Sequence, residues 1–288
     1  MSVVLSHNAY GKSRVRLTKV ERHADRHDLF EWSIDVQLSG AFEPAYAVGD
    51  NQQVVATDTM KNAVYALAAD ESLTSPEAFA LRLSRHFLTY PQVSTAKIDI
   101  TVDGWRRLEI AGKPHAHAFI GEGPDHRIAR VLAGRDSVKL TSGIADMLIL
   151  KTTDSAWRDF HRDAFRTLPD SDDRILATSL TVEWSYRAAA DWDETHAVVK
   201  DALLTSFAGH KSLGVQHTLQ AMGEAALAAA PALDEITLTM PNKHRIPMNL
   251  TPLGRANTNA IFIATDEPYG LITGTLRRGL RPSLGKCS

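Results

Sequence analysis

A repeated order of expected elements constrains the fold of this chain more than any other feature. In the first half, apolar residues alternate with polar ones, which predicts half-buried strands on both sides of a helical region. These strands are expected over residues 15–20, 30–38, 98–102 and within 117–131. Strands, then helices, then strands again indicate an antiparallel sheet with helices on one face, which is an α+β fold class.

Two helices are expected between the second and third of these strands. Thr57 or Asp58 can cap the first helix with its side chain. Ser75 precedes Pro76 and Glu77, an arrangement typical of a helix start. The apolar positions recur at helical spacing and should face the sheet. They are Met60, Val64 and Leu67 in the first helix, and Phe79, Leu83 and Phe87 in the second.

The same order of elements returns in the second half of the chain. Strands are expected over 138–150, 180–186, 236–240, 260–264 and 270–276, and helices are expected to start at Asp191 or Asp193 and at Ser212. The boundary falls near residues 134–137, which predicts two domains, 1–135 and 136–288. Each domain would leave sheet edges exposed, and such edges favour closure into a barrel through oligomerisation.

Composition restricts the class of protein. The 288 residues are 44% hydrophobic and 23% charged, as in soluble globular proteins. The formal net charge of -2 gives no overall attraction to nucleic acid or to a membrane surface. The single cysteine, Cys287, excludes an intrachain disulfide framework, and no apolar run is long enough to span a membrane. A cytoplasmic protein is the expected class.

Common cofactor and nucleophile motifs are missing from the sequence. It contains no Walker loop, dinucleotide fingerprint, Gly-x-Ser-x-Gly elbow or paired-cysteine zinc pattern. His115 and His117 would place two imidazoles on one side of a strand, where they can bind a metal ion. No further ligand is evident nearby, so the sequence predicts neither a metal site nor a cofactor.

A bend after the strand 236–240 gathers three polar residues. Pro241 lacks a backbone donor and should end the paired strand. Asn242, Lys243 and His244 follow it directly, which places an amide, an ammonium and an imidazole close together. The structural alternative is a solvated hinge, and Lys243 acquires no specific role.

Five further residues carry polar chemistry, and each has a structural alternative. Lys12 precedes the first strand, where an isolated lysine is ordinarily a surface charge. Thr57 and Asp58 stand at an expected helix N-terminus, whose free N–H groups attract anions. Arg174 can pair with a neighbouring aspartate or grip a flat anionic ligand with its planar guanidinium. Gln216 lies either at the edge of the core or toward a ligand.

Taken together, these motifs resemble the urate oxidase (uricase) family. The similarity extends over nearly the whole chain in the family's order. The segments that carry it are 10–12, 54–62, 148–153, 173–178, 215–216, 241–244 and 268–272. The resemblance implies two tandem T-fold (tunnelling-fold) modules, dimers that close a barrel, and a homotetramer. It also implies a cofactor-independent reaction of purine degradation, in which urate, dioxygen and water give 5-hydroxyisourate and hydrogen peroxide.

The resemblance also implies how protons are moved. Lys12, Thr57 and His244 would form a proton relay. Thr57 and Asp58 would contact the substrate from a neighbouring subunit, so each complete site would need residues of two chains. A lysine activated by its surroundings is a suitable base, because burial readily shifts the pKa of lysines.

Substrate contacts are implied in the same way. Arg174 and Gln216 would grip the purine in its plane, and the backbone of Val215 would add a contact. Asn242 would lie above the ring, where dioxygen or water is held. Trp157, within a long polar connection, occupies the position where the family usually stacks a phenylalanine on the purine.

Two alternative functions stay open. One is a zinc-dependent T-fold enzyme of the pterin type, supported only by His115 and His117. The other is a non-catalytic purine-binding protein, which the departure at Trp157 makes conceivable.

Overall fold

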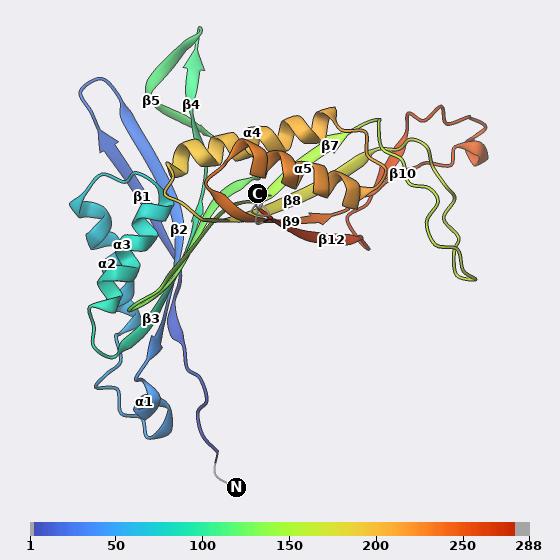
Figure 1. Ribbon diagram of the computed structural model, residues 1–288. Coiled ribbons are helices and arrows are strands. Elements are labelled where there is room, and N and C mark those ends of the chain that lie inside the picture. Colours follow the sequence, from blue (N-terminus) through green and yellow to red (C-terminus); the bar gives the residue numbers. More distant parts are fainter. Residues whose placement is uncertain (1–2, 280–288) are drawn as a thin grey trace, which may run out of the picture. The chain divides into compact units, whose positions relative to one another are not determined.

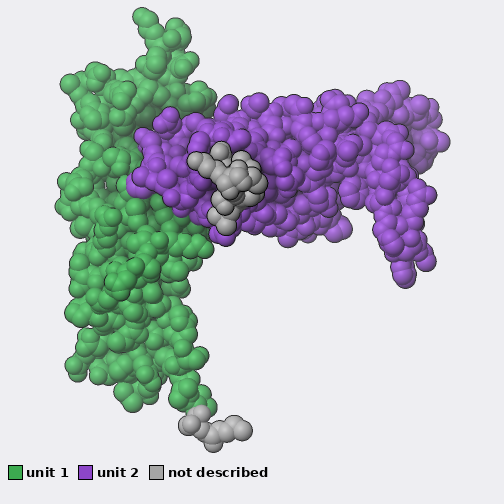
Figure 2. All heavy atoms as spheres, in the orientation of Figure 1, with its two compact units in different colours: residues 1–145 green, residues 146–288 purple. Residues whose placement is uncertain are grey.

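The computed structural model describes residues 3–279, and the chain divides into two compact units, residues 1–145 and 146–288 (Figure 2). The division falls inside a single strand, β7 (Val138–Lys151). The sequence placed the boundary at 135/136, before this strand. The difference has a simple cause: residues 138–145 of β7 pair with the preceding strand and therefore count with unit 1.

Unit 1 is an antiparallel sheet with helices, as expected. Its strand order is β1-β2-β3-β6-β7. Its elements are β1 (Tyr10–Arg22), β2 (His27–Gly40), α1 (Glu43–Ala47), α2 (Thr57–Asp70), α3 (Pro76–Leu88), β3 (Val93–Val102), β4 (Trp105–Ile110), β5 (Lys113–Gly121) and β6 (His126–Gly134) (Figure 1). Among the described residues, β1 pairs with β2 alone, so it forms an edge of the sheet.

One face of this sheet holds the core of unit 1. Alternate residues of β2 are buried beneath the helices, whereas most of their neighbours on the other face are partly exposed. The buried residues of this core include Trp32, Ile34, Val36, Leu38, Met60, Val64, Phe79, Leu83 and Phe87. Each large apolar side chain buried in this way stabilises the fold by about 1.5–3 kcal/mol. The helical spacing read from the sequence is therefore confirmed.

The hairpin β4–β5 was not anticipated. It follows β3 and precedes β6 in the sequence and forms a separate two-stranded sheet. Its turn is Ala111-Gly112. Both turn residues have positive φ, 51° and 76°, as in the type I′ turns that match strand twist. The single strand expected within 117–131 is therefore the end of β5 and the start of β6.

Unit 2 repeats the order of unit 1. Its strands lie in the order β7-β8-β9-β12, and a small sheet, β10–β11, is inserted between β9 and β12. Its remaining elements are β8 (Leu176–Tyr186), α4 (Trp192–Gly209), α5 (Val215–Ala229), β9 (Leu233–Pro241), β10 (Arg245–Pro247), the 3-10 helix η1 (Thr251–Leu253), β11 (Phe262–Ala264) and β12 (Leu271–Arg277). The doubled order of strands and helices predicted from the sequence is present.

Helix starts agree with the sequence in two cases. The hydroxyl of Ser75 accepts a hydrogen bond from the N–H of Ala78 (3.2 Å). The carboxylate of Asp191 accepts from the N–H groups of Asp193 and Glu194 (3.0 Å each). Such side-chain caps stabilise a helix by roughly 1 kcal/mol.

Two other helix starts differ from the prediction. Ala56 caps α2 without a side-chain bond, so Thr57 and Asp58 lie inside the first turn. Gly214 caps α5, and Ser212 instead bonds to the Gly214 carbonyl through its hydroxyl (3.0 Å). Ser212 is unsuited as a cap here because its backbone is held against the long connection before β8.

Among residues 3–279, no helix is both long and apolar enough to cross a membrane. Cys287 lies outside the described residues.

Candidate functional site

A pocket of about 320 Å³ in unit 2 brings together four of the residues singled out in the sequence. Trp157, Arg174, Asn242 and His244 line it, together with the segment before β8 and the sheet β10–β11. In Figure 1, the yellow-green connection before β8 and the orange segment around β10 reach the same end of unit 2. The volume lies at the lower end of the range for small-molecule sites, roughly 300–1,000 Å³.

Arg174 has an unusual environment in this pocket. Its Nε atom is buried and has no hydrogen-bond partner among the described residues. Its Cζ atom lies over the indole of Trp157, 5.5 Å from the ring centre. Burial lowers the pKa of Arg174, although a guanidinium stays charged in proteins. Arg174 is partly buried, and removing water from a cation without a counter-charge is costly, so an anionic ligand would relieve that cost.

The neighbouring aspartates do not neutralise Arg174. Asp172 forms an ion pair with Arg158 instead. Asp173 accepts hydrogen bonds from the hydroxyl of Thr153 (2.8 Å) and the N–H of Ser155 (3.2 Å). These bonds lower the pKa of Asp173 and fix the start of the connection. The structural alternative for Arg174, pairing with an adjacent carboxylate, is therefore wrong.

Trp157 is fixed by its backbone. Its N–H donates to the Ser171 carbonyl (2.8 Å), and the Ser171 N–H donates back to the Trp157 carbonyl (2.9 Å). This pair of bonds closes residues 158–170 into a loop. The long connection is thus an ordered part of the pocket wall, as expected of a functional loop.

The N-terminus of α5 is held against the same indole. The N–H of Ala156 donates to the Ser212 carbonyl (2.8 Å), which ties the connection to the turn before α5. A Cβ placed on Gly214 would lie 2.9 Å from Trp157 Cζ3 and 3.6 Å from Gln216 Oε1. Only glycine fits there, and the indole and the Gln216 amide flank it. Gln216 is exposed and Val215 is buried.

The bend after β9 has the form that the sequence indicated. β9 ends at Pro241, and the N–H of Asn242 donates to the Gly270 carbonyl (2.8 Å). Lys243 pairs with Asp266 (3.3 Å), so its charge is engaged away from the pocket lining. His244 and Asn242 are partly buried and line the pocket.

The other candidates lie in unit 1, where one tyrosine links two of the motifs. The Tyr10 hydroxyl donates to the Val55 carbonyl (3.1 Å) and accepts from the Val55 N–H (2.8 Å). It therefore ties the strand segment that contains Lys12 to the segment that leads into Thr57. Gly11, next to Tyr10, allows β1 to lie close to β2, because a Cβ there would lie 1.8 Å from the Val36 carbonyl oxygen.

Asp58 is exposed on the first turn of α2. Its carboxylate pairs with Lys61 and accepts a hydrogen bond from Asn62 (3.1 Å). The Lys61 ammonium is the main cause of the lowered pKa of Asp58, and the charge of Lys12 acts in the same direction. The candidates thus form two groups: Lys12, Thr57 and Asp58 in unit 1, and the remaining six in unit 2.

His115 and His117 lie side by side on β5, with ring centres 4.6 Å apart. Within residues 3–279, however, no group of three or more His, Cys, Asp or Glu side chains is arranged to hold a metal ion. The zinc alternative therefore lacks a third ligand in the described part of the chain.

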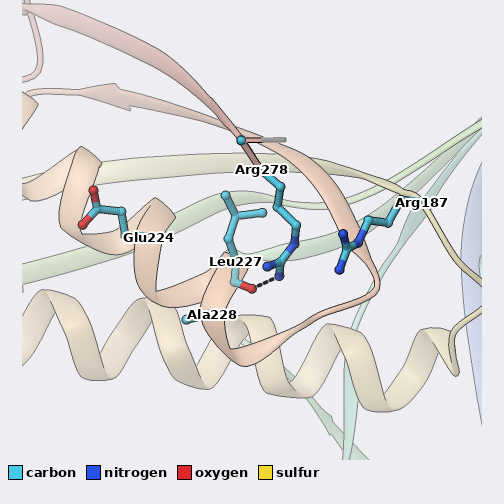
Figure 3. A pocket seen from close by; sticks show the side chains of 6 residues that line it. Arg187, Glu224, Leu227, Ala228 and Arg278 are labelled. Carbon is cyan, nitrogen blue, oxygen red and sulfur yellow. Dashed lines mark hydrogen bonds between the residues drawn. The ribbon is translucent and has the colours of Figure 1, made fainter. Parts of the chain in front are cut away.

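A larger pocket in unit 2, about 610 Å³, contains none of the candidates. Arg187, Glu224 and Arg278 line it, and Figure 3 shows the Arg278 guanidinium turned toward the carbonyl of Leu227. Arg278 also donates to the carbonyls of Leu233 (2.8 Å) and Ala230 (3.1 Å). These bonds satisfy carbonyls at the end of α5 and at the start of β9, which is a structural role.

Sequence reasoning missed several residues of the pocket and its wall. Leu168, Asp170 and Phe262 line the pocket, and Phe160 stacks on Trp157. All but Phe262 lie in the irregular connection, where no periodicity marks the residues that face inward. Only the length of that connection signalled a functional segment.

The chain matches one known family over most of its length. A family model described as Uricase matches residues 8–132 and 140–273. The chain belongs to the uricase family, which confirms the resemblance seen in the sequence.

Individual relatives agree with this assignment. The uricase of Arthrobacter globiformis is 40% identical over 278 residues, which cover 96% of this chain and 90% of the relative. That of Dictyostelium discoideum is 37% identical over 94% of this chain and 96% of the relative. The crystal structure of uricase from Arthrobacter globiformis superposes with a TM-score of 0.92 at 39% identity, and covers 98% of both chains. A uricase from Bacillus fastidious shares the fold at 20% identity, with a TM-score of 0.81 over 94% of this chain and 93% of the other.

Proposed function

We propose that this chain oxidises urate with dioxygen and water, giving 5-hydroxyisourate and hydrogen peroxide, as a cytoplasmic enzyme of purine degradation. Family membership over nearly the full length carries the activity: the chain is an oxidoreductase that acts on urate. In the proposed reaction the substrate itself supplies the electrons, and no cofactor takes part.

The observation that carries the substrate assignment is Arg174, a partly buried cation beside an indole face, whose Nε atom has no hydrogen-bond partner among the described residues. Urate is planar and anionic near neutral pH. A guanidinium can bind its charged edge in the plane of the ring, while Trp157 stacks on the ring itself. The side-chain amide of Gln216 and the backbone of Val215 form hydrogen bonds with the rest of that edge. Asn242 holds dioxygen or water above the ring.

Proton transfer is assigned to three residues. The urate anion becomes sufficiently electron-rich for dioxygen only when a further proton leaves. Lys12, acting through the hydroxyl of Thr57, takes that proton. His244 passes protons to and from the water that attacks C5, since an imidazole can exchange protons near neutral pH.

The complete site forms between subunits. Thr57 and Asp58, with Lys12 beside them, reach the purine from a neighbouring subunit. Two T-fold modules per chain close a barrel on dimerisation, and two barrels stack as a homotetramer. The free edges of the two units support this arrangement: within the described residues, β1 pairs only with β2, and β12 only with β9. Edges of this kind favour pairing with another chain.

An oxygen electrode tests the function directly. Purified protein stripped of metal should consume oxygen when urate is added, deplete the urate absorbance and release peroxide, with or without a chelator. If neither urate loss nor peroxide appears, the proposal is wrong. Urate binding without oxygen consumption would instead support the non-catalytic alternative.

A further inference from the structure

Three cation–ring and ring–ring contacts link four side chains into a stack: Arg174, Trp157, Phe160 and Arg166. The Arg174 Cζ atom lies 5.5 Å from the centre of the Trp157 ring. The rings of Trp157 and Phe160 are stacked, with centres 5.4 Å apart and planes at 16°. The Arg166 Cζ atom lies 4.6 Å from the centre of the Phe160 ring. Both kinds of contact are attractive, because cations favour ring faces and offset rings favour one another.

The outer end of this stack is anchored inside the same loop. Arg166 donates to Asp170 (2.7 Å), and Arg162 donates to the other oxygen of that carboxylate (3.1 Å). The Nε atom of Arg166 is buried without a hydrogen-bond partner among the described residues, so the Phe160 face is a principal neighbour of this guanidinium. The Trp157–Ser171 backbone pair thus holds the two ends of the loop together, and the stacked side chains add contacts within it.

Trp157 lines the 320 Å³ pocket, whereas Phe160 and Arg166 do not. The phenyl ring therefore supports the indole from outside the pocket. We propose that Phe160 and Arg166 are positioning residues that hold the Trp157 indole in place for the purine to stack on it. This inference rests on the proposed urate site, and it assigns a role in substrate affinity to two residues that do not touch substrate.

The support is needed because of where the indole lies. Trp157 is only partly buried and belongs to an irregular connection, so neither a helix nor a strand restricts its rotamer. The stacked Phe160 ring restricts it instead, together with the Gly214 backbone that lies close to the indole. Without the Phe160 ring the indole would sample other rotamers, and the purine would have to reorder it on binding, which lowers affinity.

The test compares two phenylalanines of one loop. Phe160→Ala removes the stacked ring, and Phe165→Ala removes a ring that is 91% exposed. Phe160→Ala should raise KM for urate roughly two- to tenfold, the range of one aromatic pair, with kcat nearly unchanged. Phe160→Tyr should restore the wild-type KM, and Phe165→Ala should not alter it.

A spectroscopic arm requires no substrate. Near-ultraviolet circular dichroism reports how rigidly an aromatic ring is held, and Phe160→Ala should reduce the signal from Trp157. In a Trp157→Phe background, Phe160→Ala should cause no further change in the near-ultraviolet signal. If Phe160→Ala leaves both the signal and KM unchanged, the inference is overturned, even where urate oxidation is intact. A wild-type protein that does not oxidise urate would defeat the proposed function, while the spectroscopic arm would still decide whether Phe160 holds the indole.

Folding of the variant is checked separately. If Phe160→Ala melts far below the wild type, Phe160→Leu takes its place, since it keeps most of the apolar volume and removes the ring. An unaltered KM in a folded Phe160→Leu variant would likewise overturn the inference.

Discussion

Among single residues, Arg174 best shows how the pocket is prepared for an anion. Burial lowers its pKa because water is removed from the charge and no carboxylate of the described residues replaces it. The free protein therefore carries an unfavourable interaction that the ligand removes. We therefore expect Arg174 to contribute more to ligand binding than to the stability of the free fold.

Replacing this guanidinium should separate binding from stability. Arg174→Ala should weaken urate binding by about 2–5 kcal/mol, since the substrate charge loses its partner. The melting temperature of the ligand-free protein should change little, because the lost contact with Trp157 is offset by removal of a partly buried cation without a counter-charge. Calorimetric titration and thermal melting measure the two effects. Arg158→Ala, which removes an exposed arginine paired with Asp172, is the matched control and should leave urate affinity intact.

We propose that Lys12 acts in the chemical step and not in urate binding. Lys12→Met should therefore lower kcat far more than it weakens urate binding, since the loss falls on proton transfer. Steady-state kinetics together with a direct binding measurement separate the two effects. Equal losses in both would assign Lys12 to substrate contact or to structure.

Among the contacts between secondary-structure elements, Tyr10 joins β1 to the segment before α2 through two hydrogen bonds with Val55. Tyr10→Phe should leave two backbone groups unsatisfied and cost about 1–3 kcal/mol of stability. It should also lower kcat, because Lys12 and Thr57 lose their common support. Urea denaturation and kinetics measure these effects. Tyr65→Phe removes a single exposed bond to Arg16 and should change little by comparison.

The connection between α4 and α5 should be sensitive to acid. Burial lowers the pKa of His210, and the nearby charges of His217 and Lys151 act in the same direction. The unfolded chain therefore binds a proton that the folded chain resists, and stability should fall as pH drops below about 6.5. His210→Gln should flatten this dependence, as followed by denaturant unfolding at several pH values. His161→Gln, at an exposed position, is the control and should leave the pH dependence of stability unchanged.

Elements with strong local signals were predictable, and those decided by distant contacts were not. Ser75 and Asp191 cap helices because, among the described residues, their side chains bond to the N–H groups of the following turn and to no distant group. Ser212 offers the same chemistry, but its backbone is bound to the connection before β8, so the helix starts later. The β4–β5 hairpin has a local signal in its Ala111-Gly112 turn, which a search for alternating apolar residues does not detect.

The same distinction applies to the site. Arg174, Asn242 and His244 were found because they stand at element ends within recognisable motifs, and they do line one pocket. Phe160 and Arg166 could not be found, because their roles depend on a loop whose closure joins Trp157 to Ser171. No spacing rule relates such positions in an irregular segment.

For the complete chain and its assembly, the two groups of candidates predict complementation between inactive chains. When Lys12→Met and Arg174→Ala chains are mixed by joint refolding or co-expression, a mixed dimer contains one site with both defects and one intact site. Activity should recover to about a quarter of the wild-type value, since half of randomly formed dimers are mixed and each has one good site of two. The rate of peroxide release by the mixture measures the recovered activity.

As the control, each variant alone should show little activity after the same treatment, when urate is kept near the wild-type KM so that the weakened binding of Arg174→Ala is not overcome. No recovery in verified mixed oligomers would mean that Lys12 and Arg174 of the same chain serve one site. Light scattering on the wild type gives the mass of the assembly independently.

The strand β7 has a consequence for how such a chain can be altered. It passes from one unit to the other as a single strand of 14 residues with no linker, and Asp146 at the junction has a φ of 58°. One residue inserted near Ala145 would turn every following side chain of the strand to the opposite face. A length change at this junction is therefore tolerated only in steps of two, and a cut there would deprive both fragments of part of a strand. A reporter split into two independently expressed halves, or a circularly permuted form, should open the chain at the Ala111-Gly112 turn instead.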